Sequence, residues 1–217
     1  MSTQKTSADP HFIKKRSSAK DTPCFILASN SPRRLDLLAQ IAITPDQIIP
    51  ANIDETPRNN EVPKAYAERM ACEKAAAISA KNPNAWILAA DTVVAAGRRI
   101  IPKAETEDQA KRALHLLSGR RHRVITGIAL VKPDGSMLHK TVCSVVRFKV
   151  LAKTEIDHYI QSGEWRGKAG GYAIQGLAAT FVQSLSGSYS NIVGLPLFEV
   201  AGWLASVGYV NNKASCS

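Results

Sequence analysis

The sequence predicts an α/β fold built around a mixed β-sheet, and three observations support this. Isolated apolar runs alternate with amphipathic segments, which is typical of strands and helices packed in layers. Two segments of alternating polarity flank the turn "KPDGS" and predict an antiparallel hairpin, so the sheet holds strands of both directions. The 217 residues are 45% hydrophobic but only 6% aromatic. That is enough for one sizeable core of Ala, Val, Ile and Leu, or for two lobes sharing a sheet.

The amino-terminal half predicts buried strands that alternate with helices. Ser31 suits the cap of the first helix, and Pro32 suits its first turn because it has no N–H to leave unpaired. The second helix is rich in Ala, Glu and Lys, and Pro83 follows it. In order, we expect a strand at 25–28, a helix from Ser31, a strand-like piece within 44–57, a helix at 61–81 and a strand at 86–91 ("WILAAD") that ends at Asp91.

The carboxy-terminal half predicts hairpins and short helices. Thr106 with Gln109 three residues on is a capping-box pattern, and Gly119 ends that helix. The last helix is expected to turn Leu197, Val200, Ala201 and Leu204 inward. In order, we expect a hairpin turning near Gly97, a helix from Thr106, strands at 122–131 and 139–150, a helix at 154–162, strand-like pieces at 171–176 ("GYAIQG") and 179–185, and a helix at 196–207.

Residues 23–210 should form one folded unit, with a disordered extension at 1–22 and a flexible tail at 211–217. The formal net charge of +10 favours anionic partners. No apolar stretch reaches the roughly 18 residues of a membrane helix, and no secretory signal pattern is present, so we expect a cytoplasmic protein without a membrane partner. The four cysteines, Cys24, Cys72, Cys143 and Cys216, form no CxxC pair. Cys24, Cys72 and Cys143 are expected to be buried, reduced thiols because they lie in strand-like or helical runs.

Two adjacent arginines stand where the first strand turns into a helix. Arg33 and Arg34 lie in the first turn, where the helix dipole disfavours each cation by roughly 0.3–1 kcal/mol. A bound anion would offset that cost. The alternative is a pair of solvated surface arginines.

Carboxylates occur at two places that could meet in a cleft. Asp91 directly follows an apolar strand, and the ends of α/β strands commonly line a ligand crevice. Asp54 and Glu55 lie on a loop. Because magnesium takes only one or two protein carboxylates and completes its shell with water and phosphate oxygens, one carboxylate from each place suffices. The alternatives are a capping aspartate and a solvated acidic loop.

Lysines and a glutamine complete the candidate set. Lys103 lies in a segment expected to fold back near the strand ends, and Lys168 lies in the glycine-rich "WRGKAGGY". Gln175 offers one donor and one acceptor, which match uracil or thymine but also adenine. The sequence contains no Walker phosphate loop, H-E-x-x-H motif or G-x-S-x-G motif.

Taken together, residues 24–208 resemble the Maf family of nucleoside triphosphate pyrophosphatases. The motifs that carry the resemblance are "LASNSPRRLDLL", "IDE", "ADTVV", "IPKAE", "LSGRRHRVITGIAL", "GKAGGYAIQG" and "GSYSNIVGLPL". The resemblance implies an elongated fold related to the inosine-triphosphate pyrophosphatases, with two lobes around a cleft. It also implies cleavage of the α–β phosphoanhydride with a divalent metal cation, Mg²⁺ or Mn²⁺.

The dTTP/UTP branch of the family carries Arg, Thr and Gln at three specificity positions, matched here by Arg34, Thr92 and Gln175. The 7-methyl-GTP branch would have Trp-Arg, Gln and Glu instead. The chain departs from the pattern at Asn30, at Ala104 where a proline commonly follows the lysine, and in its amino-terminal extension.

The resemblance assigns a role to each candidate residue. Ser29, Ser31, Arg33 and Arg34 form a phosphate cradle, with Lys168 as a weaker member. Glu55 and Asp91 hold the metal, Asp91 orients or deprotonates the attacking water, and Lys103 offsets charge on the leaving pyrophosphate. Both dTTP and UTP are expected substrates, because one methyl group is worth only about 1–3 kcal/mol of discrimination. CTP and modified pyrimidine triphosphates stay open as further substrates.

Other functions compete with this interpretation. The basic run "GRRHR" would suit a nucleic-acid-binding module, but the chain lacks a recognisable binding motif or an aromatic stacking platform. A nucleotide sensor linked to cell division would keep the same fold, and another base preference would keep the same chemistry. The resemblance is compatible with a homodimer.

Overall fold

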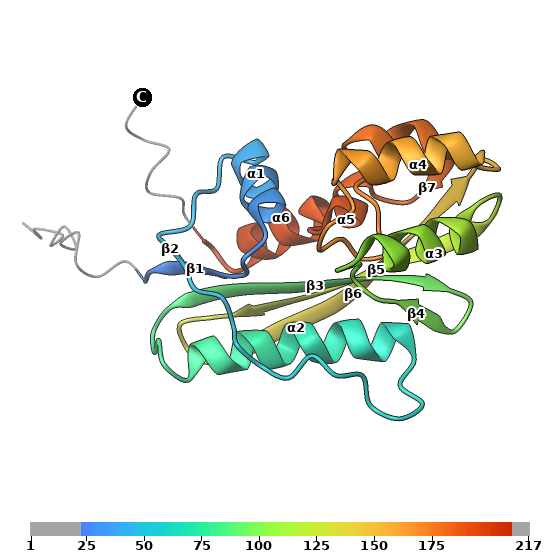
Figure 1. The fold of residues 1–217 in the computed structure, drawn as a ribbon. Coiled ribbons are helices and arrows are strands. Elements are labelled where there is room, and N and C mark those ends of the chain that lie inside the picture. Colours follow the sequence, from blue (N-terminus) through green and yellow to red (C-terminus); the bar gives the residue numbers. More distant parts are fainter. Residues whose placement is uncertain (1–22, 210–217) are drawn as a thin grey trace, which may run out of the picture.

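The computed structural model describes residues 23–209. The predictions for 1–22, for 211–217 and for Cys216 lie outside these residues. Within them, a seven-stranded mixed sheet forms the centre of the molecule (Figure 1). The strands are β1 (Phe25–Ala28), β2 (Gln47–Ile48), β3 (Trp86–Ala96), β4 (Arg99–Ile101), β5 (Arg121–Val131), β6 (Met137–Phe148) and β7 (Val182–Ser186).

The sheet contains both strand directions, as predicted. Its order is β2-β1-β3-β5-β6-β7, and the short β4 also pairs with β3. β1 runs parallel to β2 and β3, whereas every other pairing is antiparallel. The predicted hairpin turn at "KPDGS" joins β5 to β6, and the turn near Gly97 joins β3 to β4.

Helices cover the two faces of the sheet unequally. The long α2 lies along one face, and the shorter helices lie on the other (Figure 1). The helices are α1 (Pro32–Gln40), α2 (Pro63–Ser79), α3 (Glu107–Leu117), α4 (Lys153–Ser162), α5 (Tyr189–Val193) and α6 (Leu197–Ser206), with a 3₁₀ turn at η1 (Leu177–Phe181).

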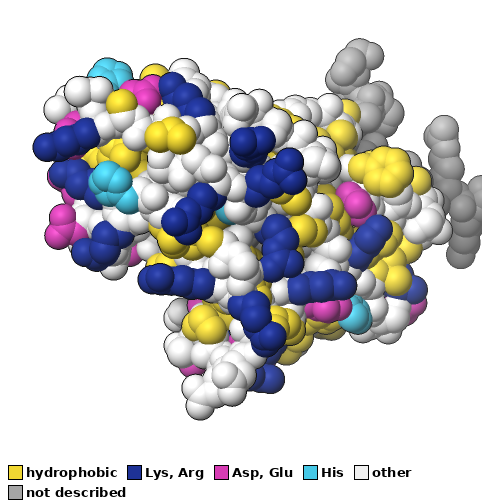
Figure 2. Space-filling model, turned by 90° about the vertical axis from the view of Figure 1, so that its right-hand side faces the viewer, with side chains coloured by type: hydrophobic (Ala, Val, Ile, Leu, Met, Phe, Trp, Pro, Cys, Tyr) yellow, Lys and Arg dark blue, Asp and Glu magenta, His cyan; other side chains and the backbone are white. Residues whose placement is uncertain are grey.

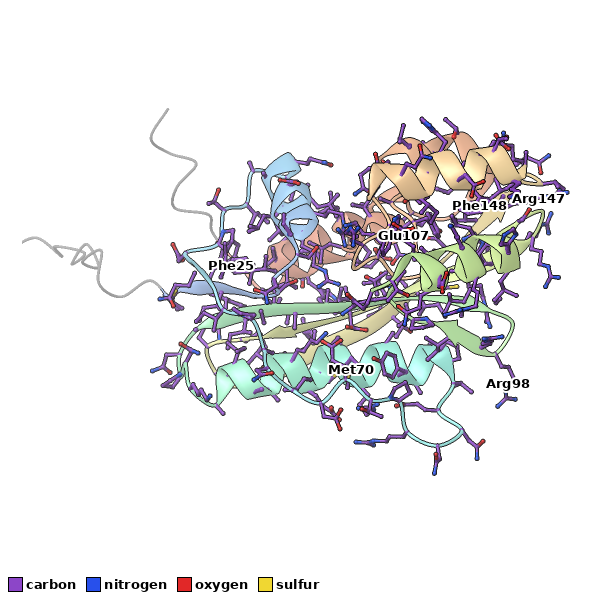
Figure 3. The ribbon with its side chains drawn as sticks, in the orientation of Figure 1. Phe25, Met70, Arg98, Glu107, Arg147 and Phe148 are labelled. Atoms are coloured by element: carbon purple, nitrogen blue, oxygen red, sulfur yellow. The ribbon has the colours of Figure 1, made fainter. Side chains whose placement is uncertain are left out.

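The core on the many-helix face divides into two clusters. Phe25 belongs to one, with residues of α1 and α6, and Phe148 belongs to the other, with residues of α3 and α4. The two side chains lie toward opposite ends of the sheet (Figure 3). These clusters correspond to the two expected lobes.

β3 is longer than predicted, and this difference shapes the site. The prediction that the strand ends at Asp91 is wrong: β3 continues to Ala96 and pairs with β5 throughout. The neighbouring strand is the one that ends. β1 stops at Ala28, opposite Ala89, and β4 pairs with β3 only over Val94–Ala96. The intervening residues of β3 therefore have no strand beside them on that edge.

Several smaller predictions also differ from the structure. The segment 171–176 forms turns, because Gly171 has φ +67° and the Ala173 N–H donates to the Tyr159 hydroxyl and not to a neighbouring strand. Ala201 is exposed on α6. Cys143 is exposed on β6, so it is not the buried thiol that was expected, and Cys24 and Cys72 are half-buried.

Other local predictions are confirmed. The Thr106–Gln109 capping box opens α3, and Gly119 follows its end with φ +69°. Ser31 occupies the N-cap of α1 with Pro32 after it, although its side chain makes no capping hydrogen bond.

Gly127 of β5 sets how closely α2 approaches the sheet. A Cβ at this position would overlap the backbone carbonyl of Ala67. We expect Gly127→Ala to lower the free energy of unfolding by about 3 kcal/mol, because overpacking displaces backbone and not merely a flexible side chain. Urea denaturation measures this. The control is Gly202→Ala on α6, where a Cβ meets nothing, and equal stability of the two variants would contradict the packing argument.

Candidate active site

A cavity of about 380 Å³ opens where β3 lacks a neighbouring strand. It is bordered by the end of β1, the start of α1, the loop before α2, and the glycine-rich segment before η1. Ten of the side chains singled out from the sequence line it, namely Ser29, Ser31, Arg33, Arg34, Glu55, Asp91, Thr92, Lys103, Lys168 and Gln175. Asp54 is instead exposed and accepts a hydrogen bond from the Thr56 N–H. Residues from distant parts of the chain thus meet at one place.

A chain of alternating charges runs along one side of the cavity. The Lys74 ammonium of α2 lies 2.6 Å from Asp91 Oδ1 and 2.7 Å from Glu55 Oε1. Lys103 Nζ lies 3.1 Å from the other Glu55 oxygen. Asp91 is only 5% exposed and Lys74 only 8% exposed. A buried carboxylate and a buried ammonium therefore neutralise each other beside the open edge of β3.

Sequence reasoning missed Lys74, although a signal was present. Residues of α2 at helical spacing are buried against the sheet, including Ala67, Ala71, Ala75 and Ile78. Lys74 falls within that apolar stripe, where a lysine needs a buried partner. Asp91 supplies it from β3, directly across from Gly127 of β5.

The loop that carries Glu55 is fastened to α2. The Tyr66 hydroxyl donates to the Glu55 carbonyl at 2.7 Å, and Arg69 donates to the Thr56 carbonyl at 3.2 Å. Burial acts to raise the pKa of Glu55, but its contacts with Lys74 and Lys103 outweigh this and hold the pKa below its ordinary value. Glu55 is therefore a carboxylate at neutral pH.

The same loop contains an acid-sensitive ion pair. The Glu61 carboxylate receives two hydrogen bonds from Arg69, at 2.6 and 2.7 Å. These bonds lower the pKa of Glu61 from 4.5 to about 2. A depressed carboxylate pKa contributes stability that is present above pH 4.5 and is lost as the pH falls toward 2.

We therefore expect Glu61→Gln to flatten the acid limb of the stability profile. Urea midpoints measured from pH 7 to pH 3 should fall less steeply for the variant than for the wild type. Asp134→Asn, in an exposed turn, serves as the control for removing a carboxylate elsewhere. Parallel profiles for Glu61→Gln and the wild type would contradict the assignment.

Arg34 is held rigidly on the other side of the cavity. Its guanidinium donates to the Gly194 carbonyl at 2.8 Å, to Ser29 Oγ at 2.7 Å and to Thr92 Oγ1 at 3.4 Å. Burial lowers the pKa of Arg34, and Asp91 opposes that effect. Burial also lowers the pKa of Arg33 beside it. Two partly desolvated guanidinium groups at a helix start attract an anion.

The segments that carry Lys103 and Lys168 are joined to each other. Lys103 bridges to Ala169, and the Ala104 N–H donates to the Lys168 carbonyl at 3.2 Å. A proline at this position would lack that donor, so the departure at Ala104 supports the placement of both lysines. Burial lowers the pKa of Lys168, and nearby Arg33 lowers it further.

Part of the cavity lining is apolar. Val94 and Val124 are cross-strand partners in the sheet, and they line the cavity with Tyr172, Ile174 and Ile192. Gln175 follows directly after Ile174. The cavity therefore offers cations and carboxylates together with an apolar surface and the amide of Gln175.

Comparison with known proteins identifies the family of the chain. Residues 24–207 match the family model described as "Maf-like protein". The chain belongs to the Maf family. A dTTP/UTP pyrophosphatase of Rhodospirillum rubrum is 59% identical over 85% of this chain and 88% of its own. The one from Caulobacter vibrioides is 55% identical over 86% of this chain and 97% of its own. The structure of a HAM1 protein from Coxiella burnetii superposes with a TM-score of 0.45 at 17% identity, over 83% of this chain and 98% of that one.

The Maf site is suited to a divalent cation with few protein ligands. Within residues 23–209 no group of three or more His, Cys, Asp or Glu side chains is placed to hold a metal. Asp91 and Glu55 nevertheless both approach the same Lys74 ammonium, so the two carboxylates face one point. Two carboxylates are what Mg²⁺ takes when substrate phosphates and water complete its shell. The donor set fits such an ion only when a phosphate ligand is present.

Proposed function

We propose that this Maf protein hydrolyses the α–β phosphoanhydride of pyrimidine nucleoside triphosphates, dTTP and UTP, to the monophosphate and pyrophosphate. The observation that carries the proposal is the mixed lining of the cavity. Cations lie beside a buried carboxylate, and apolar side chains and the Gln175 amide line the same cavity. Relatives named dTTP/UTP pyrophosphatase, at 59% and 55% identity, support the same substrates. Such an activity would remove surplus or damaged nucleotides from the cellular pool.

The charged side chains of the cavity would bind the triphosphate and activate water. Arg33 and Lys168 would contact phosphate oxygens directly, with hydroxyl donors from Ser29 and Ser31. Arg34, held by three hydrogen bonds, would contribute a fixed positive charge. Asp91 would accept a proton from the water that attacks the α-phosphorus. The bond to the bridging oxygen then breaks, and pyrophosphate leaves beside Lys103.

A divalent metal ion completes the proposal. Mg²⁺ or Mn²⁺ would be held by Glu55 and Asp91, and when bound it would neutralise charge on the phosphates. Lys74 would keep both carboxylates pointed at the same place. Its short contacts with them would thus fix the ligand positions before substrate arrives.

The apolar lining would receive the base. Gln175 can donate its amide N–H to a ring carbonyl of uracil or thymine. The base must share a cavity of about 380 Å³ with the sugar and the phosphates, and a purine adds a second ring. We therefore propose that purine triphosphates are poor substrates.

Product analysis on a panel of nucleoside triphosphates tests the proposed function. We expect pyrophosphate and monophosphate from dTTP and UTP with Mg²⁺ or Mn²⁺, little product from ATP or GTP, and none with EDTA. Preference for 7-methyl-GTP would keep the reaction and reject the role of Gln175. Salt-sensitive binding of DNA or RNA without turnover would favour the nucleic-acid alternative instead.

The surface charge also suits an anionic substrate. Lys and Arg side chains are spread over the face seen in Figure 2. At the end of the molecule with β4, exposed arginines include Arg98 and Arg147, labelled in Figure 3. Such a field speeds the encounter with nucleotides at low ionic strength.

No helix among residues 23–209 is long and apolar enough to span a membrane. We further propose that the protein is cytoplasmic, and a homodimer and a regulatory role in cell division are compatible with the proposed function.

A further inference from the structure

A buried threonine behind the cavity fixes the hydrogen-bond direction of a cavity residue. Thr92 of β3 lines the cavity, and Thr126 lies directly across from it on β5, fully buried. Their hydroxyl oxygens are 2.9 Å apart, so one hydroxyl donates to the other. Thr126 Oγ1 also lies 3.0 Å from the backbone carbonyl of Asn191.

Only one assignment of hydrogens satisfies both contacts. A carbonyl oxygen can only accept, and a hydroxyl has a single hydrogen to donate. Thr126 must therefore donate to Asn191, and Thr92 must donate to Thr126. A second carbonyl, that of Gly194, lies farther from Thr92, at 3.4 Å. The shorter contact to Thr126 takes the hydrogen.

With its hydrogen committed to Thr126, Thr92 presents only lone pairs elsewhere. Arg34 donates to Thr92 Oγ1 at 3.4 Å and occupies one of them. The other is available on the half-buried side of Thr92 that lines the cavity. Any ligand group that bonds there must be a donor. Phosphate oxygens ionised at neutral pH are not donors, which leaves the base or the sugar hydroxyls.

The sheet places Thr92 beside the apolar lining of the cavity. Side chains alternate along a strand, so Thr92 shares a face with Val94 and not with Asp91. Val94 and its cross-strand partner Val124 belong to the apolar lining. The acceptor therefore faces the part of the cavity that, under the proposed function, takes the pyrimidine.

We propose that Thr126 is a specificity-determining positioning residue: it locks Thr92 as a hydrogen-bond acceptor, which selects pyrimidines with a ring N3–H, uracil and thymine, over cytosine. Cytosine has a lone pair at N3 and so meets the Thr92 oxygen with like polarity. This inference rests on the proposed function, because it assumes that a pyrimidine occupies the cavity. Thr126 touches no substrate and acts only through Thr92.

Thr126→Val tests the proposal, because valine keeps the shape and removes the acceptor. The freed Thr92 hydroxyl can then rotate and donate to N3 of cytosine. We expect the ratio of kcat/KM for UTP over CTP to fall roughly tenfold, mainly through a gain on CTP. Thr126→Ser keeps the hydroxyl and should keep the ratio within about twofold of the wild type. Equal losses on both substrates, with the ratio unchanged, would mean that Thr126 is only structural and would overturn the proposal.

A matched control separates the loss of the Thr126 hydroxyl from a loosening of α5. The Ser144 hydroxyl accepts from Asn191 Nδ2 at 3.0 Å and from the Ser188 N–H at 3.0 Å, so it also fastens α5 to the sheet. Ser144→Ala removes those contacts and leaves the Thr92–Thr126 pair untouched. It should preserve the UTP/CTP ratio. A drop equal to that of Thr126→Val would assign the effect to packing.

Binding measurements keep this test independent of turnover and of variant folding. UTP and CTP analogues with a methylene group between the α- and β-phosphorus atoms resist cleavage, and calorimetry gives their Kd ratio for each variant. The 3-deaza analogue of UTP, with carbon in place of N3–H, should bind the wild type roughly tenfold more weakly than UTP does. Wild-type binding of the analogues without turnover of UTP would reject the proposed reaction, yet the Kd ratio would still decide the role of Thr126. Equal binding of UTP and its 3-deaza analogue, or no binding of either, would overturn the inference.

Discussion

Asp91→Asn should lower kcat for UTP by about a thousandfold, because an amide cannot accept the proton of the attacking water. The carboxylate is 5% exposed and lies at the open edge of β3, where no other described carboxylate is as deeply buried in the cavity lining. Steady-state pyrophosphate release with saturating Mg²⁺ gives the measurement. Because asparagine has nearly the same shape and Lys74 keeps its contact with Glu55, the fold should persist.

The control for this variant is Asp108→Asn, the same chemical change at an exposed position in the first turn of α3. Its kcat should equal that of the wild type. Circular dichroism of both variants checks that loss of activity is not loss of structure. If Asp91→Asn retains activity within tenfold, Asp91 is not the proton acceptor.

Lys74→Met should have the second large effect, on both stability and activity. Removing the ammonium leaves Asp91 and Glu55 as neighbouring carboxylates with no cation of α2 between them. Removing one partner of a buried ion pair lowers the free energy of unfolding by about 3 kcal/mol or more. Lys103 still pairs with the half-exposed Glu55, so it offsets only part of this loss. Activity should be lost as well, because both carboxylates lose their common partner.

The pH dependence of Lys74→Met gives a sharper test than its stability alone. Neighbouring carboxylates repel each other when ionised, so protonating either one relieves the variant. The free energy of unfolding of the variant should therefore fall furthest below the wild-type value above pH 6. The difference between the two should shrink as the pH falls toward 4. Lys64→Met, at an exposed position of the same helix, is the control and should match the wild type. A difference in the free energy of unfolding that is constant with pH would indicate that the variant has lost packing and not charge.

Much of the candidate site could be predicted from the sequence because its residues sit in short local patterns. Arg33 and Arg34 in a helix start, Lys168 among glycines and Asp91 after an apolar run each carry a signal that neighbouring residues complete. The resemblance to the Maf family added which of them belong together. The structure then placed every one of them on the same cavity.

What could not be predicted depends on contacts between distant segments. Asp91 was expected at a strand end, yet β3 continues because the end of β1, and not of β3, creates the opening. The partner of Lys74 is known only once α2 is seen to cross the sheet at Gly127. Thr126 reads in the sequence as an ordinary strand residue. Its role depends on three atoms, from β3, β5 and α5, that no local pattern connects.

The most direct test of the proposed reaction is to follow the oxygen of the attacking water. UTP should be hydrolysed by the wild-type protein with Mg²⁺ in water enriched in oxygen-18, and the products analysed by mass spectrometry. Attack at the α-phosphorus predicts one labelled oxygen in UMP and none in pyrophosphate. Label in pyrophosphate, or formation of UDP with labelled inorganic phosphate, would contradict the α–β cleavage on which the whole arrangement of Asp91, Glu55 and the cationic residues depends.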